Sequence, residues 1–174
     1  MSTTTAHEIT VSWQDIPFVP ETESLIRRAV QAALGRHLSS TACVNVVLVN
    51  DEIIGRLHQE FLGSPGPTDV LSFDLSDEAP PPAAMAAPTS PAAHLIEGEV
   101  VVSAETAARE AAHRGIDVSA EIALYALHGT LHLLGFDDAD DIRASRMHAE
   151  EAAILSSLGL GDVFQARPRR DAKQ

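Results

Sequence analysis

The chain has 174 residues with 45% hydrophobic and 21% charged side chains, which is the size and composition of one folded domain and excludes an intrinsically disordered protein. Its single cysteine, Cys43, excludes a disulfide framework, and the lack of a long apolar run or of a basic, apolar leader predicts a cytoplasmic protein with no membrane partner. The formal net charge of −13 repels nucleic acid, so a phosphate-binding function needs a local positive charge such as a divalent cation.

The first half of the chain alternates strand patterns with helix patterns. Strands are predicted where apolar residues alternate or where β-branched residues cluster, and helices where apolar residues recur every three to four positions. A segment rich in glycine and proline, 63–67, must end the second helix. In chain order, the predicted elements are a strand over 8–13, a helix over 21–38, a strand over 43–49, a helix capped by Asn50, and a strand over 69–74.

The second half begins with a low-complexity insert. Residues 79–93 contain seven alanines and five prolines, which predicts a flexible surface loop. The elements predicted after it are a strand over 98–103 and helices over 103–114, 119–134 and about 140–158.

These patterns predict one α/β (α+β) domain. We expect about four short strands in a single mixed sheet covered by about five helices, with a metal site on a helix–turn near the C-terminal third. The predicted organisation is a disordered N-terminus over 1–7, a catalytic domain over 8–160 with a flexible insert at about 76–95, and a flexible basic tail over 161–174.

The segment from His128 to Asp138 carries the strongest chemical pattern. His128 and His132 are four residues apart on a predicted helix, so both imidazoles lie on one face and offer a metal two nitrogen ligands. Gly135 is placed to end the helix in a left-handed turn, which brings Asp138 back as an oxygen ligand. Two imidazoles and one carboxylate leave a position for water and suit Zn²⁺, with Mn²⁺, Fe²⁺ or Ni²⁺ as alternatives.

The same residues have a structural interpretation. Histidines at this spacing can be hydrogen-bonded core residues, and an acidic cluster can cap the next helix. We expect Asp137, Asp140 and Asp141 to be helix-capping or solvated residues, and Asp138 to be a metal ligand. Zinc proteases share the two-histidine platform, but Gly129 stands where their His-Glu-x-x-His helix has its glutamate base, which disfavours peptide hydrolysis.

The segment resembles the signature of the YbeY endoribonucleases, the bacterial rRNA maturation factors, whose pattern runs His-Gly-x-Leu-His-Leu-x-Gly-Phe/Tyr-Asp-His. Pro-Thr-Asp-Val-Leu-Ser-Phe at 67–73 and Gly-Glu-Val-Val-Val-Ser at 98–103 are similar to further motifs of the family, in the same order. The resemblance spans about residues 8–160. Two positions depart from it: Asp138 replaces the usual third histidine ligand, and Leu62 replaces an arginine associated with phosphate binding.

The resemblance implies metal-dependent cleavage of single-stranded RNA, in maturation of the 16S rRNA 3′ end and in ribosome quality control. The implied partners are rRNA, the small ribosomal subunit and a ribosome-assembly GTPase, and the implied cofactor is one Zn²⁺. The expected metal-holding and catalytic residues are His128, His132 and Asp138. Candidate substrate contacts, which turn-to-strand chemistry also explains in part, are Thr68, Asp69, Ser72 and Arg56.

Two other functions compete with this interpretation. A ribosome-associated assembly factor with weak or lost nuclease activity is consistent with the net charge of −13 and with Leu62. A metalloprotease-like hydrolase would use the same histidines but lacks the glutamate base at Gly129.

Overall fold

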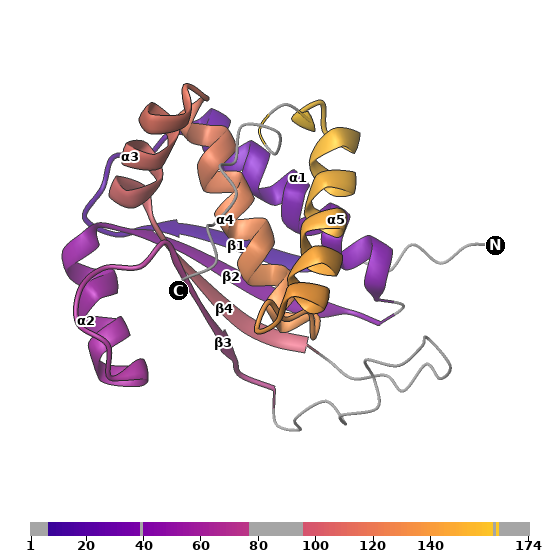
Figure 1. Ribbon diagram of the computed structural model, residues 1–174, viewed down its shortest axis with the longest axis horizontal. Helices are drawn as coiled ribbons and strands as arrows, with labels where there is room; N and C mark the ends of the chain where they lie inside the picture. The colour runs from indigo at the N-terminus through magenta and orange to yellow at the C-terminus, as the bar shows by residue number, and fades with distance from the viewer. Residues whose placement is uncertain (1–6, 39, 77–95, 162, 164–174) are drawn as a thin grey trace.

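A computed structural model describes residues 7–38, 40–76, 96–161 and 163 (Figure 1). The predicted insert at about 76–95 and the predicted tail over 161–174 lie almost entirely outside the described residues, as does all but the last residue of the predicted N-terminal segment 1–7. Within the described residues, no helix has the length and apolar character needed to cross a membrane.

Four strands and five helices make up the described part of the chain, as the sequence predicts. The strands are β1 (Glu8–Trp13), β2 (Ala42–Val49), β3 (Val70–Asp74) and β4 (Ile96–Ser103). The helices are α1 (Pro20–His37), α2 (Asp51–Leu62), α3 (Ala104–Arg114), α4 (Val118–Leu133) and α5 (Asp141–Ser157).

The strands form one mixed sheet in the order β1-β2-β4-β3. β1, β2 and β4 run parallel, and β3 pairs antiparallel with β4 in a register that sets Val70 opposite Val102. Parallel neighbours need a long crossover, and α1 supplies the one between β1 and β2. The prediction of a mixed sheet is therefore confirmed.

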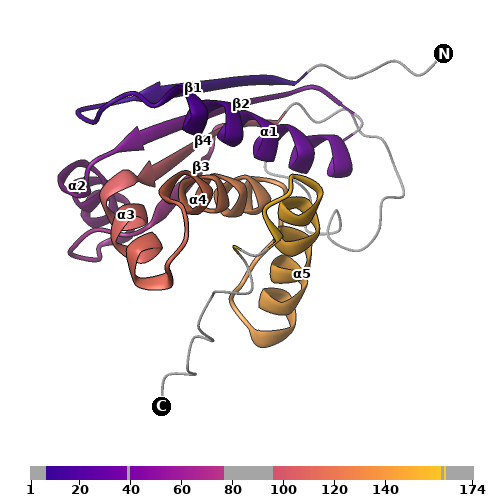
Figure 2. The ribbon, with the colours of Figure 1, turned by 90° about the horizontal axis from the view of Figure 1, so that it is seen from above.

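Side chains alternate between the two faces of the sheet, and each face forms its own core. The two cores differ in size. The larger core joins one face to α1, α4 and α5, with Leu34, Val46 and Leu131 fully buried. On the other face, Val101 packs with Ile54 of α2 in a smaller cluster. Figure 2 shows α1 and α4 side by side over the sheet, with α5 across one end of α4. The helix that carries both histidines thus lies on the face opposite α2.

Asp51 joins the starts of α2 and α3. Its carboxylate accepts hydrogen bonds from Ser103 Oγ at 2.5 Å, Thr106 Oγ1 at 2.8 Å and Arg109 Nη1 at 2.6 Å. Burial acts to raise the pKa of Asp51, but these donors together outweigh burial and hold the pKa below its ordinary value. The carboxylate therefore stabilises the fold above the unfolded pKa, near about 4, and this contribution is lost as the pH falls through the folded pKa.

We expect Asp51→Asn to lower the free energy of unfolding by about 1–2 kcal/mol at pH 7, because an amide accepts weaker hydrogen bonds than a carboxylate. The difference from the wild type should shrink as the pH falls below about 4, in urea unfolding followed from pH 7 to pH 3. Glu60→Gln, an exposed change on the same helix, is the control and should have no measurable effect. A pH-independent difference for Asp51→Asn would contradict the linkage.

Candidate metal centre

The end of α4 brings the predicted ligands together. Gly135 has φ 87°, and its N–H donates to the carbonyl of His132 at 2.9 Å, while the Phe136 N–H reaches back to Leu131 O at 3.0 Å. This left-handed turn reverses the chain after the helix and returns Asp138 towards the histidines. The turn predicted at Gly135 is confirmed.

The ligand atoms of His128, His132 and Asp138 all lie within 4.8 Å of one another. The two Nε2 atoms are 3.1 Å apart, and each lies 3.9 Å from an oxygen of Asp138. Donor atoms about 2.0–2.1 Å from a tetrahedral zinc ion stand about 3.3 Å from each other, so small side-chain movements would complete such a site. The structure thus places all three predicted ligands around one point.

Both imidazole rings are oriented by partners at Nδ1. His132 Nδ1 lies 3.1 Å from the carbonyl oxygen of Phe136, which only accepts, so Nδ1 carries the hydrogen and Nε2 a lone pair in the neutral ring. His128 Nδ1 lies 2.5 Å from Oε1 of Glu151, and a carboxylate there imposes the same tautomer. In these tautomers both Nε2 lone pairs point into the same space, 3.1 Å apart, where a divalent cation can accept them. The donor set therefore fits a divalent cation.

Glu151 is the residue of this centre that the sequence analysis missed. It lies on α5 with its side chain 0% exposed, in the buried stripe that also holds Met147, Ile154 and Leu155. A charged residue within an apolar stripe at helical spacing was the available signal, because such a residue needs a buried partner. His128, whose Nδ1 lies 2.5 Å from the carboxylate, is one such partner.

The centre is open on one side. The exposed fractions of the side chains are 13% for His128, 31% for His132 and 36% for Asp138. Burial, reinforced by the neighbouring His128, lowers the pKa of His132, so its Nε2 keeps a free lone pair to lower pH than an exposed histidine would. The centre is therefore most accessible to solvent on the side of Asp138.

The neighbouring aspartates lie at the start of α5 and away from the histidines, and Asp140 caps the helix. Asp140 accepts a hydrogen bond from the backbone N–H of Arg143 at 2.9 Å and begins α5, and Asp141 lies in its first turn. The Arg143 guanidinium also contacts Asp137 Oδ2 at 2.5 Å. Asp138 alone of this cluster faces the histidines.

Gly129 allows α4 to approach the sheet beside His128. A Cβ added there would lie 2.5 Å from Val100 Cγ1, 2.8 Å from Ser72 Oγ and 3.0 Å from Val70 Cγ2. Position 129 therefore faces β3 and β4, and a glutamate at this position would meet the sheet. This geometry removes the general-base position that a metalloprotease-like hydrolase requires.

We expect Gly129→Ala to destabilise the protein by about 1–3 kcal/mol, because overpacking against Val100 outweighs the gain of up to about 1 kcal/mol in helix propensity. Gly35→Ala in α1 is the matched control, since nothing lies within 4 Å of its added Cβ. That variant should be unchanged or more stable in thermal unfolding. Equal stabilisation by both substitutions would show that Gly129 is not a close-packing position.

The candidate substrate contacts before and within β3 have structural partners. Ser72 Oγ donates to the carbonyl of Gly129 at 3.0 Å, which holds β3 beside the metal centre. Asp69 Oδ1 accepts from Thr68 Oγ1 at 3.0 Å and from the N–H of the next residue at 2.9 Å, which orders the turn into the strand. Burial, with the charges of Glu121 and Asp69, raises the pKa of Tyr125, one turn before His128. Substrate contact by these residues stays a prediction.

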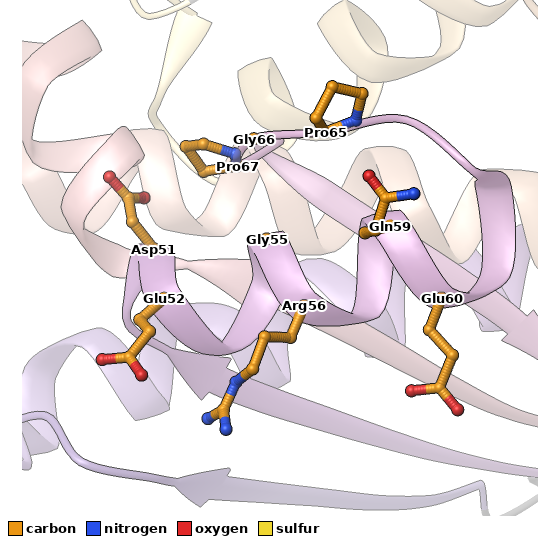
Figure 3. A pocket seen from close by; sticks show the side chains of 9 residues that line it. All are labelled: Asp51, Glu52, Gly55, Arg56, Gln59, Glu60, Pro65, Gly66 and Pro67. Atoms are coloured by element: carbon orange, nitrogen blue, oxygen red, sulfur yellow. The ribbon is translucent and has the colours of Figure 1, made fainter.

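Arg56 is not brought to the metal centre. It is exposed on α2, on the face of the sheet opposite α4, and lines an open cavity of about 510 Å³ beside the loop 65–67. Figure 3 shows Glu52, Arg56 and Glu60 extending from one side of the helix. Carboxylates four residues before and after an arginine on a helix attract its guanidinium. This placement separates Arg56 from His128 and His132.

Fold and centre together define an α/β protein with two imidazoles and one carboxylate around an open point, the donor set of many catalytic zinc sites. A family model described as Endoribonuclease YbeY matches residues 8–159. The chain belongs to this family.

Relatives support the same assignment. The Endoribonuclease YbeY of Moorella thermoacetica is 37% identical over 147 residues, covering 84% of this chain and 92% of that protein. The protein of the same name from Heliobacterium modesticaldum is 39% identical over 117 residues, covering 67% of this chain and 70% of its own. A Thermotoga maritima protein solved in solution has a TM-score of 0.57 at 20% identity, covering 95% of this chain and 99% of that one, which shows the shared fold.

Proposed function

We propose that this protein is a metal-dependent endoribonuclease that cleaves single-stranded RNA. The observation that supports it most directly is the convergence of His128 Nε2, His132 Nε2 and the Asp138 carboxylate on one open point. Relatives that share 35–37% of their residues over 84% of this chain are named endoribonucleases, which supports RNA as the substrate class.

Zn²⁺ is the proposed ion, held by His128, His132 and Asp138. When bound, such a cation stabilises negative charge at phosphate and lowers the pKa of water. Contacts at Nδ1 with Phe136 O and with Glu151 orient the two rings so that each Nε2 faces the proposed ion. The open side at Asp138 admits the RNA backbone, and a cation there offsets locally the net charge of −13.

The proposed setting is cytoplasmic maturation of the 16S rRNA 3′ end and quality control of ribosomes. The small ribosomal subunit and a ribosome-assembly GTPase are the proposed partners. The family resemblance supports this setting, and the cleavage of rRNA that it requires uses the metal centre described above.

A second candidate is a ribosome-assembly factor with weak or lost nuclease activity. Two features favour it: Leu62, 64% exposed, stands where the family resemblance implies an arginine, and Arg56 lies on the opposite face of the sheet from α4. Neither residue supplies a cation near the histidines.

The test incubates zinc-loaded protein with a single-stranded RNA, with a duplex of the same sequence, with small ribosomal subunits and with a peptide mixture. We expect cleavage of the single strand that stops when a chelator removes the metal. Binding to small subunits without RNA cleavage would favour the assembly factor. Cleavage of peptides alone would refute the proposal.

A further inference from the structure

α5 carries two adjacent glutamates with opposite surroundings. Glu150 faces α1, where its carboxylate contacts Arg36 at 2.5 Å and His37 at 2.9 Å with 17% of the side chain exposed. Glu151 faces α4, is fully buried, and contacts His128 Nδ1 at 2.5 Å. Only the second of these carboxylates touches the candidate metal centre.

We propose that Glu151 is a positioning residue of this centre: its buried carboxylate sets the orientation and tautomer of His128 and so strengthens metal binding. The proposal rests on the proposed metal dependence of the protein. The experiments below measure metal affinity and ring tautomer instead of RNA cleavage. The role of Glu151 and the proposed function can therefore fail independently of each other.

The burial of Glu151 supports an electrostatic role. A carboxylate out of water is costly unless it is hydrogen-bonded, and His128 Nδ1 lies within hydrogen-bond distance of it, at 2.5 Å. Its neighbours in the buried stripe of α5, Met147 and Ile154, are 0% exposed and apolar, so the carboxylate lies in an interface that excludes water. His128 is thereby held with its Nε2 directed at Nε2 of His132, 3.1 Å away.

The two imidazoles consequently differ as ligands. His132 Nδ1 lies against a neutral backbone carbonyl, whereas His128 Nδ1 lies against a fully buried carboxylate. A carboxylate behind a ligating histidine fixes the ring and increases its basicity, and loss of such a partner typically weakens metal binding by about 10- to 100-fold. Together with Asp138, Glu151 also balances the two positive charges of a divalent cation.

The first experiment compares Glu151→Gln with Glu150→Gln. Glutamine keeps the volume and a hydrogen-bond acceptor but removes the charge, so a purely packing role would survive the change. We expect zinc affinity, measured by competition with a chelating dye, to fall about 10- to 100-fold for Glu151→Gln and to stay unchanged for Glu150→Gln. Both proteins are first checked for folding by circular dichroism. A folded Glu151→Gln variant with wild-type zinc affinity would overturn the proposal.

The second experiment needs no folded variant and no metal. ¹⁵N NMR of the metal-free wild type at pH 8 reports which nitrogen of each neutral histidine ring carries the hydrogen. We expect His128 in the Nδ1–H form. An Nε2–H form would overturn the proposal irrespective of any variant. If the tautomer and the zinc affinities are as expected but the protein does not cleave RNA, the role of Glu151 stands and the proposed function is refuted.

Discussion

If the proposed function is correct, we expect His132→Ala to lose metal binding at the centre and to cleave single-stranded RNA about 100-fold or more slowly. The substitution deletes one of three donors and leaves His128 and Asp138 3.9 Å apart. Two donors from a partly exposed surface hold a divalent cation far more weakly than three. Metal content by elemental analysis and kcat/KM on single-stranded RNA measure the two effects on the same preparation.

His113→Ala is the control for this prediction. His113 is exposed in the last turn of α3, so its loss removes an imidazole without touching the centre. Metal content and cleavage should both match the wild type. If His132→Ala retained full cleavage after losing its metal, the reaction would not depend on this centre.

The ligand cluster could be predicted because its geometry is local. A spacing of four on a helix places His128 and His132 on one face, and the positive φ of Gly135 returns Asp138 after only a few residues. The element order was equally accessible, since alternation and helical periodicity depend on near neighbours in the chain. Cap residues such as Asn50, whose side chain accepts from Ile53 N–H at 2.9 Å, sharpen the helix starts.

Contacts between distant elements could not be predicted in this way. Glu151 meets His128 across 23 residues, through the packing of α5 on α4 that no spacing encodes. The placement of Arg56 depends on which face of the sheet α2 covers. Tertiary packing determines both the contact between Glu151 and His128 and the position of Arg56, and residue spacing within one helix predicts neither.

A buried ion pair between α3 and α4 gives the largest expected effect on stability. Arg114 Nη1 donates to Glu121 Oε2 with 6% and 2% of the two side chains exposed, and Arg114 Nη2 donates to the carbonyl of Val163. We expect Arg114→Met to lower the free energy of unfolding by about 3–5 kcal/mol at pH 7, because it leaves the Glu121 carboxylate buried without its cation. Urea unfolding followed by circular dichroism measures this loss.

Two further variants separate the buried charge from a general loss of packing. Arg36→Met removes a pair that is half exposed on the arginine side, and it should change stability little because solvent screens such pairs. In the double variant Arg114→Met with Glu121→Leu, no unpaired charge is buried, so most of the lost stability should return. A double variant as unstable as Arg114→Met alone would mean that packing and the link to Val163, not the ion pair, account for the loss.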